Sequence, residues 1–239
     1  MKIIPVIDIK QGQVVHAIKG QRDKYHVIKS RLCNGSDPVI IIDALLKFYP
    51  FPIIYVADLD AITGCGNNYE IITTILNDNP QLTLWLDSGI KKVDEIKNKQ
   101  FPQIIDVIGT ESVTNTEELL EIKNRYPDSI LSLDFADNHF LGDKAILNTK
   151  DAWQNNVIVM LLDRVGTNTG PDIELASTIK IQNPDKKVYL AGGIANISHL
   201  ESINKKNIDG VLIATALHTG NITREHIEMV ASGYKIITS

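Results

Sequence analysis

Short apolar runs recur along this chain, and longer amphipathic stretches separate them. Continuous apolar runs of this length are typical of strands that are buried on both faces of a parallel sheet. The eight runs cover residues 3–8, 53–57, 82–86, 104–108, 130–134, 157–162, 188–191 and 210–213.

Most of the intervening stretches have helical periodicity. Asn115, Asp172 and Asn196 stand where amino-terminal caps are expected for three of them. Alternating strands and helices predict a parallel sheet, and eight such units predict a closed (β/α)8 TIM barrel of the α/β class. The clearest helical stretches are residues 38–49, 68–77, 116–125, 172–182 and 196–204.

Two segments interrupt this rhythm. Residues 13–20 alternate enough for a small hairpin, and the polar residues 21–29 follow them. Residues 137–155 fit a hairpin, a short helix or both, and their periodicity does not decide between these.

Three motifs of the first half return in the second half at a nearly constant offset of 103 to 105 residues. Residues 56–64 resemble 160–166, residues 86–90 resemble 190–194, and residues 108–112 resemble 213–217. The repeat indicates two half-barrels, about residues 1–126 and 127–239, within a single TIM-barrel domain. Asp8 and Asp134 then end equivalent strands on opposite sides of the barrel mouth.

Composition narrows the function classes. The chain has 239 residues and a formal net charge of −5, so it has no electrostatic case for binding nucleic acid. Cys33 and Cys65 are too few for a disulfide framework and lack metal-ligand spacing. We see no signal peptide, and charges interrupt every apolar run before the ~20 residues that a membrane span needs. We expect a cytoplasmic protein without membrane contact.

Carboxylates at strand ends are the first candidates for chemistry. Asp8 and Asp134 face one mouth by barrel symmetry, and such a pair can act as general acid and general base. The alternative is that they cap loops or pair with a lysine. Asp163, which parallels Asp60, is a supporting catalytic candidate, although it could instead form a local ion pair with Arg164.

Small residues at the ends of the last two strands are the candidate phosphate site. Barrels often hold a phosphate after strands seven and eight, where backbone N–H groups can approach an anion. The alternative is a tight turn that needs positive φ. The residues of this phosphate site are Gly192, Gly193, Ala214 and Thr215.

The equivalent place in the first half is less clear. Its small residues, a second and doubtful ligand site, are Ser88, Gly89, Gly109 and Thr110. Asp87 and Glu111 bring two carboxylates to the same place, and these repel a phosphate at close range. Either both acids point away, or this side takes another group, such as an amine.

The loop after the first strand offers a third group of candidates, since His16, Lys19 and Arg22 could clamp an anionic substrate. The alternative is a solvated loop. We expect no cofactor and no metal; a cation held by Asp58, Asp60 and Asp87 is a weaker alternative than ordinary strand-end acids.

The opening Ile-Ile-Pro-Val-Ile-Asp-Ile, the half-barrel repeat and the motifs at residues 163–167, 191–194 and 211–217 resemble the histidine-biosynthesis family of HisA and HisF. The resemblance implies a ribotide isomerase or cyclase fold, an Asp pair across the mouth, and two phosphate sites for a long bisphosphate substrate. Asp8 and Asp134 match the family carboxylates, and Gly192, Gly193 and Thr215 match one phosphate site.

Four positions depart from the family pattern. Val165 stands where the loop-six Asp is expected, Met160 replaces a threonine, Asp87 begins what is usually Gly-Gly-Gly, and His16 replaces an arginine. Residues 14–22 and 57–61 look closer to a HisA/HisF-related branch of methanogens and methylotrophs, which implies one-carbon cofactor (tetrahydromethanopterin or methanofuran) biosynthesis.

The sequence therefore predicts a HisA/HisF-like enzyme, an isomerase, lyase or condensing enzyme, that acts on a small phosphorylated sugar-derived substrate with Asp8 and Asp134. A true histidine-pathway isomerase and a non-catalytic ligand-binding or assembly protein are the alternatives. An oligomer is possible.

Overall fold

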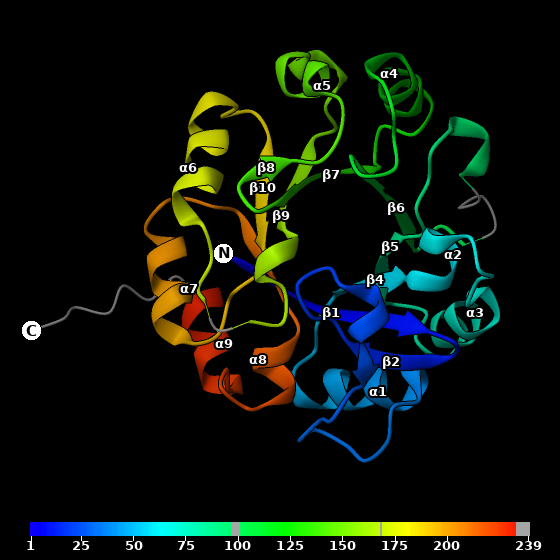
Figure 1. The fold of residues 1–239 in the computed structure, drawn as a ribbon. Helices are drawn as coiled ribbons and strands as arrows, with labels where there is room; N and C mark the ends of the chain where they lie inside the picture. Colours follow the sequence, from blue (N-terminus) through cyan, green and yellow to red (C-terminus); the bar gives the residue numbers. More distant parts are fainter. Residues whose placement is uncertain (97–100, 168, 233–239) are drawn as a thin grey trace, which may run out of the picture.

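Eight parallel strands close into a barrel, which confirms the predicted (β/α)8 fold (Figure 1). The computed structural model describes residues 1–96, 101–167 and 169–232. β11 pairs with β1, and this pairing closes the ring. The barrel strands are β1 (Lys2–Lys10), β4 (Ile53–Asp58), β5 (Thr83–Asp87), β6 (Ile104–Gly109), β7 (Ile130–Ala136), β9 (Asn156–Leu161), β10 (Lys187–Ala191) and β11 (Gly210–Ile213).

Helices surround this ring (Figure 1). The longer ones are α1 (Pro38–Phe48), α3 (Tyr69–Asp78), α4 (Thr116–Arg125), α6 (Ile173–Gln182), α7 (Ile197–Asn204) and α9 (Arg224–Ala231). The shorter ones are α2 (Leu59–Thr63), α5 (Lys144–Asn148) and α8 (Thr215–His218), with 3-10 turns η1 (Arg22–Lys24), η2 (Val93–Glu95), η4 (Lys150–Ala152) and η5 (Leu162–Arg164). The three predicted caps are confirmed: Asn115, Asp172 and Asn196 each accept a hydrogen bond from a backbone N–H of the first turn.

In each half of the barrel, the first strand is followed by a short strand that pairs with it antiparallel. β2 (Gln13–His16) pairs antiparallel with β1 and also with β3 (His26–Val27), while β8 (His139–Phe140) pairs with β7. The segment after β7 therefore holds both a hairpin and the short helix α5, the two alternatives that its periodicity left open.

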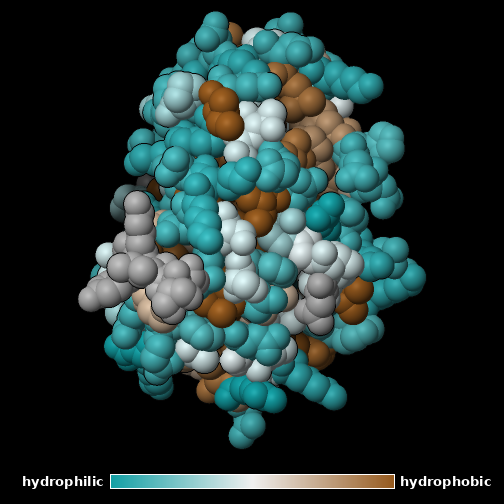
Figure 2. Space-filling model, turned by 90° about the vertical axis from the view of Figure 1, so that its left-hand side faces the viewer, coloured by the Kyte–Doolittle hydropathy of each residue, from teal (hydrophilic) through white to brown (hydrophobic). Residues whose placement is uncertain are grey.

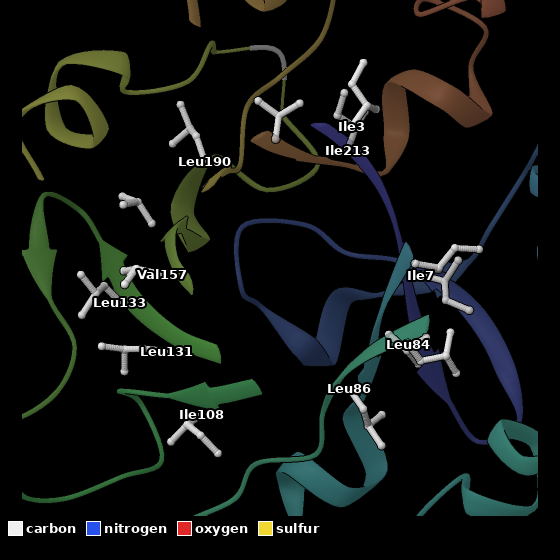
Figure 3. Close-up of a cluster of buried hydrophobic side chains, with 14 of the residues drawn as sticks. Ile3, Ile7, Leu84, Leu86, Ile108, Leu131, Leu133, Val157, Leu190 and Ile213 are labelled. Carbon is white, nitrogen blue, oxygen red and sulfur yellow. The ribbon is translucent and has the colours of Figure 1, made fainter. Parts of the chain in front are cut away.

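Alternation along the strands divides the core into two layers. Side chains such as Ile7, Leu86 and Leu133 belong to the outer layer, which packs under the helices (Figure 3). The inner layer fills the barrel with the side chains of Ile4, Tyr55, Ala57, Trp85, Val107, Ile130, Ile158, Tyr189, Ala191 and Leu212. This period of two decides which strand-end residues point into the barrel mouth.

The surface in Figure 2 is mostly hydrophilic, with apolar residues scattered over it. In the described part of the chain, no helix combines the length and the apolar character needed to cross a membrane. Cys33 and Cys65 are both free thiols.

Candidate active site

Three aspartates end strands with their side chains on the inner side of the barrel. On β1, Ile4 belongs to the inner layer, so the same alternation turns Asp8 inward. Asp8 is in register with Ala57, and Ala57 with Asp87 of β5. Asp134 ends the equivalent stretch of β7, and all three carboxylates line one cavity at the carboxyl ends of the strands.

Asp134 is held rigidly. Its side chain is 5% exposed; the Ser132 hydroxyl donates to Oδ1 at 2.7 Å and the Glu111 N–H donates to Oδ2 at 3.0 Å. Gly109 makes room for it, since a Cβ there would lie 3.0 Å from Oδ2. Burial raises the pKa of Asp134 to about 7, against the two hydrogen bonds that lower it, and the charges of Asp87 and Glu111 raise it further.

Asp8 has a different setting on the opposite side. Its carboxylate makes no side-chain hydrogen bond within the described residues, so it is left facing the cavity. Burial raises the pKa of Asp8 to about 7, with a further rise from Asp87 and an opposing effect of Arg22. Near neutral pH both carboxyls can therefore give or take a proton, which is what acid–base chemistry requires.

The charge of Asp87 acts on both of these acids and raises the pKa of each. The Tyr55 hydroxyl donates to its Oδ2 at 3.0 Å and the Gly89 N–H donates to its Oδ1 at 3.0 Å. Burial is the largest cause that raises the pKa of Asp87. Tyr55 is a site residue that sequence reasoning missed, although its inward position on β4 was available from the alternation.

The second ligand site predicted from small residues does not form as one site. Gly109 lines the mouth cavity, but Ser88 and Gly89 line a separate pocket beside Asp58 and Asp106. Thr110 is buried, and its hydroxyl accepts a hydrogen bond from the Asp134 N–H. β5 ends at Asp87, and the turn that follows, in which Gly89 has a φ of 70° and its N–H donates to Asp87, takes Ser88 and Gly89 away from the mouth.

The four small residues of the predicted phosphate site all line the mouth cavity, on the β10 and β11 side. Gly192 and Gly193 have φ of 101° and 78°, and a Cβ on either would come within 2.5 Å of a carbonyl oxygen, that of Leu161 or Gly170. The turn itself therefore requires both glycines. In the described part of the chain no hydrogen bond uses the N–H groups of Gly193 or Thr215, so both remain for a ligand.

The loop after β1 reaches both sides of the mouth. His16 Nε2 lies 3.1 Å from the Thr215 hydroxyl, and burial lowers the pKa of His16, with a further fall from His26. Arg22 pairs with Glu111 at 2.8 Å on the other side. Of the three predicted loop residues, Arg22 lines the mouth cavity, whereas His16 lines a neighbouring pocket together with Ala214 and Thr215. Lys19 is exposed and lines neither.

Comparison with known proteins identifies the family. Residues 2–223 match the model of the family described as histidine biosynthesis protein. This chain belongs to that family.

Individual relatives match this chain over nearly its whole length. An uncharacterized protein of Methanocaldococcus jannaschii is 34% identical over 95% of this chain and 97% of its own length. Two further relatives are named as isomerases of a bis-phosphoribosyl imidazole-4-carboxamide. The protein of Nitrosopumilus maritimus is 28% identical over 97% of this chain and 100% of its own length. The protein of Streptococcus sanguinis is 26% identical over 98% of this chain and 99% of its own length. The chain is an enzyme of the HisA/HisF type.

Within this histidine-biosynthesis fold, loop six, which follows β9, departs at Val165 from the pattern that the resemblance implies. Val165 lines the mouth cavity, so an apolar side chain occupies the position of the expected loop-six acid. The loop-one backbone rests on it, because the Lys19 N–H donates to the Val165 carbonyl at 2.9 Å. Met160 also lines the cavity.

Asp163 does not join this site. It lines a separate small pocket beside Arg164 and Asp172, outside the residues around the mouth. Arg164 pairs with Asp172 at 3.7 Å rather than with Asp163. η5 begins at Leu162 and turns the chain before Asp163, which carries this side chain away from the cavity.

Asp58 and Asp60 have structural partners. Asp58 accepts hydrogen bonds from the N–H and the side-chain amide of Asn68, and Asp60 accepts one from the Gln11 N–H. These bonds tie the β1–β2 turn to the segment before α3. Among the described residues, no group of three or more His, Cys, Asp or Glu side chains is arranged to hold a metal ion.

Proposed function

We propose that this protein catalyses acid–base isomerisation or rearrangement of a small phosphorylated sugar-derived molecule, with Asp8 and Asp134 as the proton-transfer pair. One observation carries the proposal. Two carboxyls from equivalent strands line a single cavity, and burial raises the pKa of each to about 7. Groups with pKa near the working pH are the most effective general acids and bases.

The chemistry that such a pair performs is a balanced proton exchange. A protonated carboxyl donates a proton to an oxygen or nitrogen of the substrate while an ionised carboxylate removes one from a neighbouring carbon. The substrate gains one proton and loses another, so the product is an isomer. The charge of Asp87 raises the pKa of both Asp8 and Asp134, so the protonation of each acid depends on that of Asp87.

The β10–β11 side of the mouth supplies the binding energy that positions the substrate. Gly192, Gly193, Ala214 and Thr215 would hold a phosphate, with His16 beside the Thr215 hydroxyl. Binding energy from such a remote group offsets the cost of orienting the reacting atoms.

We assign the reaction to one-carbon cofactor biosynthesis (tetrahydromethanopterin or methanofuran) rather than to the histidine pathway. Val165 has no proton to exchange, so the cavity lacks the loop-six acid that the resemblance implies for the isomerases of this family. The identity with the methanogen protein, 34%, is also higher than that with the named isomerases, 28% and 26%. The second candidate is the ribotide isomerase itself, which the names of those relatives favour.

The test is an assay of the purified protein with the bis-phosphoribosyl imidazole-4-carboxamide of the named relatives, and then with phosphorylated pterin and furan intermediates. Asp8→Asn should lower turnover of the active substrate by about 10²–10⁴-fold. Asp78→Asn is the matched control, since Asp78 is exposed at the end of α3 and should leave turnover unchanged.

Turnover of the ribotide would place the protein in histidine biosynthesis and overturn the pathway assignment. An Asp8→Asn protein that keeps full activity would overturn the catalytic pair. Binding without turnover of every candidate would mean a barrel that has lost its chemistry.

A further inference from the structure

The β5–β6 side of the mouth differs in charge from the side that holds the phosphate candidates. Asp87 and Glu111 line the cavity here, between Asp8 of β1 and Asp134 of β7, which line it too. Among the described residues that line it, Arg22 is the one lysine or arginine, and its guanidinium is committed to Glu111 at 2.8 Å. Within the described residues the other three acids form no salt bridge, although the charge of Arg22 lowers the pKa of Asp8 and Asp87.

The side chain of Asp87 is fixed in a pose that faces the cavity. The Tyr55 hydroxyl and the Gly89 N–H each hold one of its oxygens at 3.0 Å. Tyr55 is itself 3% exposed, so the inner layer of the barrel supports this arrangement from below. A carboxylate oriented by two donors keeps further lone pairs for a ligand.

A phosphate placed beside these acids would be repelled. Charges of like sign a few ångströms apart in a partly buried site repel by several kcal/mol, and water screens them little there. A cationic nitrogen at the same place is attracted, and it can donate hydrogen bonds to Asp87 and to Asp8, whose carboxylate has no side-chain hydrogen bond among the described residues.

We infer that Asp87 is a specificity-determining residue that binds a positively charged nitrogen of the substrate, so that the substrate is a monophosphate with an amine at its other end. The phosphate would lie on Gly192, Gly193, Ala214 and Thr215, across the mouth. This substrate class rests on the proposed function, because the proposed phosphate site anchors one end of the molecule.

A cation bound at Asp87 would also act on the acid–base pair. Asp87 is a common neighbour that raises the pKa of both Asp8 and Asp134. A cation bound at Asp87 cancels this repulsion, so amine binding favours the ionised form of the pair. Recognition of the amine would thus prepare the proton-accepting carboxylate.

The experiment compares three series of probes by isothermal titration calorimetry: alkyl phosphates, ω-aminoalkyl phosphates and alkane bisphosphates with two to six carbons. At the best length, the wild-type protein should bind the aminoalkyl phosphate about tenfold or more tightly than the alkyl phosphate, the gain typical of one charged hydrogen bond. The bisphosphate should bind more weakly than the aminoalkyl phosphate.

Asp87→Asn keeps the shape of the side chain and removes its charge, so the advantage of the amine should disappear while alkyl phosphate binding stays unchanged. Thr215→Val is the matched variant on the opposite side, and it should weaken all three series together. The comparison among probes in the wild-type protein stands even if the Asp87 variant fails to fold.

Equal binding of alkyl and aminoalkyl phosphates, or tightest binding of the bisphosphate, would overturn the inference and leave the phosphate site intact. An amine advantage that survives Asp87→Asn would move the specificity away from Asp87 and also overturn it. Absence of binding by every phosphate would overturn the proposed phosphate site and the inference together. Bisphosphate binding that depends on added Mg²⁺ would show that these acids hold a metal ion, and it too would overturn the inference.

Discussion

The two sides of the barrel mouth are built from equivalent strand ends but differ in charge. The β10–β11 side presents Gly192, Gly193 and Thr215 with no acid among them, whereas the β5–β6 side presents Asp87 and Glu111. The strands and their alternation are the same on both sides, so the difference lies in a few residues after each strand. A repeated fold fixes where a ligand group lies, and those residues determine which charge it carries.

The largest expected effect concerns which acids belong to the reacting pair. Asp134→Asn should lower turnover by about 10²–10⁴-fold, since an amide cannot exchange the proton. Asp163→Asn should leave turnover close to wild type, because Asp163 lines a different pocket. Steady-state kinetics checks both variants, with the substrate that the wild-type protein turns over in the assay proposed above. Equal losses in the two would return Asp163 to the site and contradict the observed position of η5.

The next largest effect is expected when an acid is introduced near the β10–β11 side of the mouth, which tests the difference in charge between the two sides. Val165→Asp adds a carboxylate to the cavity wall, and it should weaken binding of an alkyl phosphate about tenfold by repulsion. Val165→Asn is the control for shape and polarity without charge. Calorimetric titration measures both, and unchanged affinity in the Asp variant would show that phosphate binds away from loop six.

The two acids of the proton-transfer pair also predict an unusual pH dependence of stability. Burial raises the pKa of Asp8 and Asp134 to about 7 in the folded state, from an ordinary value of 3.8. The folded state therefore binds more protons than the unfolded state between about pH 4 and 7, and the free energy of unfolding falls as the pH rises through this window.

Removal of the Asp8 carboxyl should restore part of the free energy of unfolding that is lost at high pH. Asp8→Asn should raise Tm by about 2–4 °C at pH 8, the shift that about 1 kcal/mol produces in a domain of this size, and by less at pH 5. Differential scanning calorimetry at the two pH values measures this difference. An equal effect at both would mean that Asp8 has an ordinary pKa.

The smallest effect concerns Arg22, which pairs with Glu111 on the β5–β6 side. Arg22→Gln removes the partner of Glu111, whose side chain is 39% exposed, so unfolding free energy should change by less than about 1 kcal/mol. The same variant should bind an aminoalkyl phosphate a few-fold more tightly, since one competing positive charge is gone. Tighter binding of the alkyl phosphate instead would contradict the assignment of the charges.

The barrel could be predicted from the sequence because its strands are short apolar runs and its helices have clear caps. Asn115, Asp172 and Asn196 illustrate this, since each cap forms as expected from its place before an amphipathic stretch. The segment after β7 could not be decided, because a two-residue strand such as β8 leaves no periodic signal.

The candidate site was harder to predict where one residue decides the direction of a side chain. Asp8, Asp134, Gly192, Gly193 and Thr215 line the cavity as expected. Ser88 and Gly89 do not, because they lie in the turn after β5, which takes both into a separate pocket. Asp163 lies within the 3-10 turn η5, whose direction the sequence pattern does not reveal.

The most direct test of the acid–base pair needs no substrate. Carbon-13 NMR of the aspartate carboxyl groups, titrated from pH 3 to pH 10, should show two signals with apparent pKa values near 7. One of these signals should be absent from the spectrum of Asp8→Asn and the other from that of Asp134→Asn. If both carboxyls instead titrate near 4, they are ordinary ionised acids at neutral pH, and the proposed proton-transfer pair is wrong.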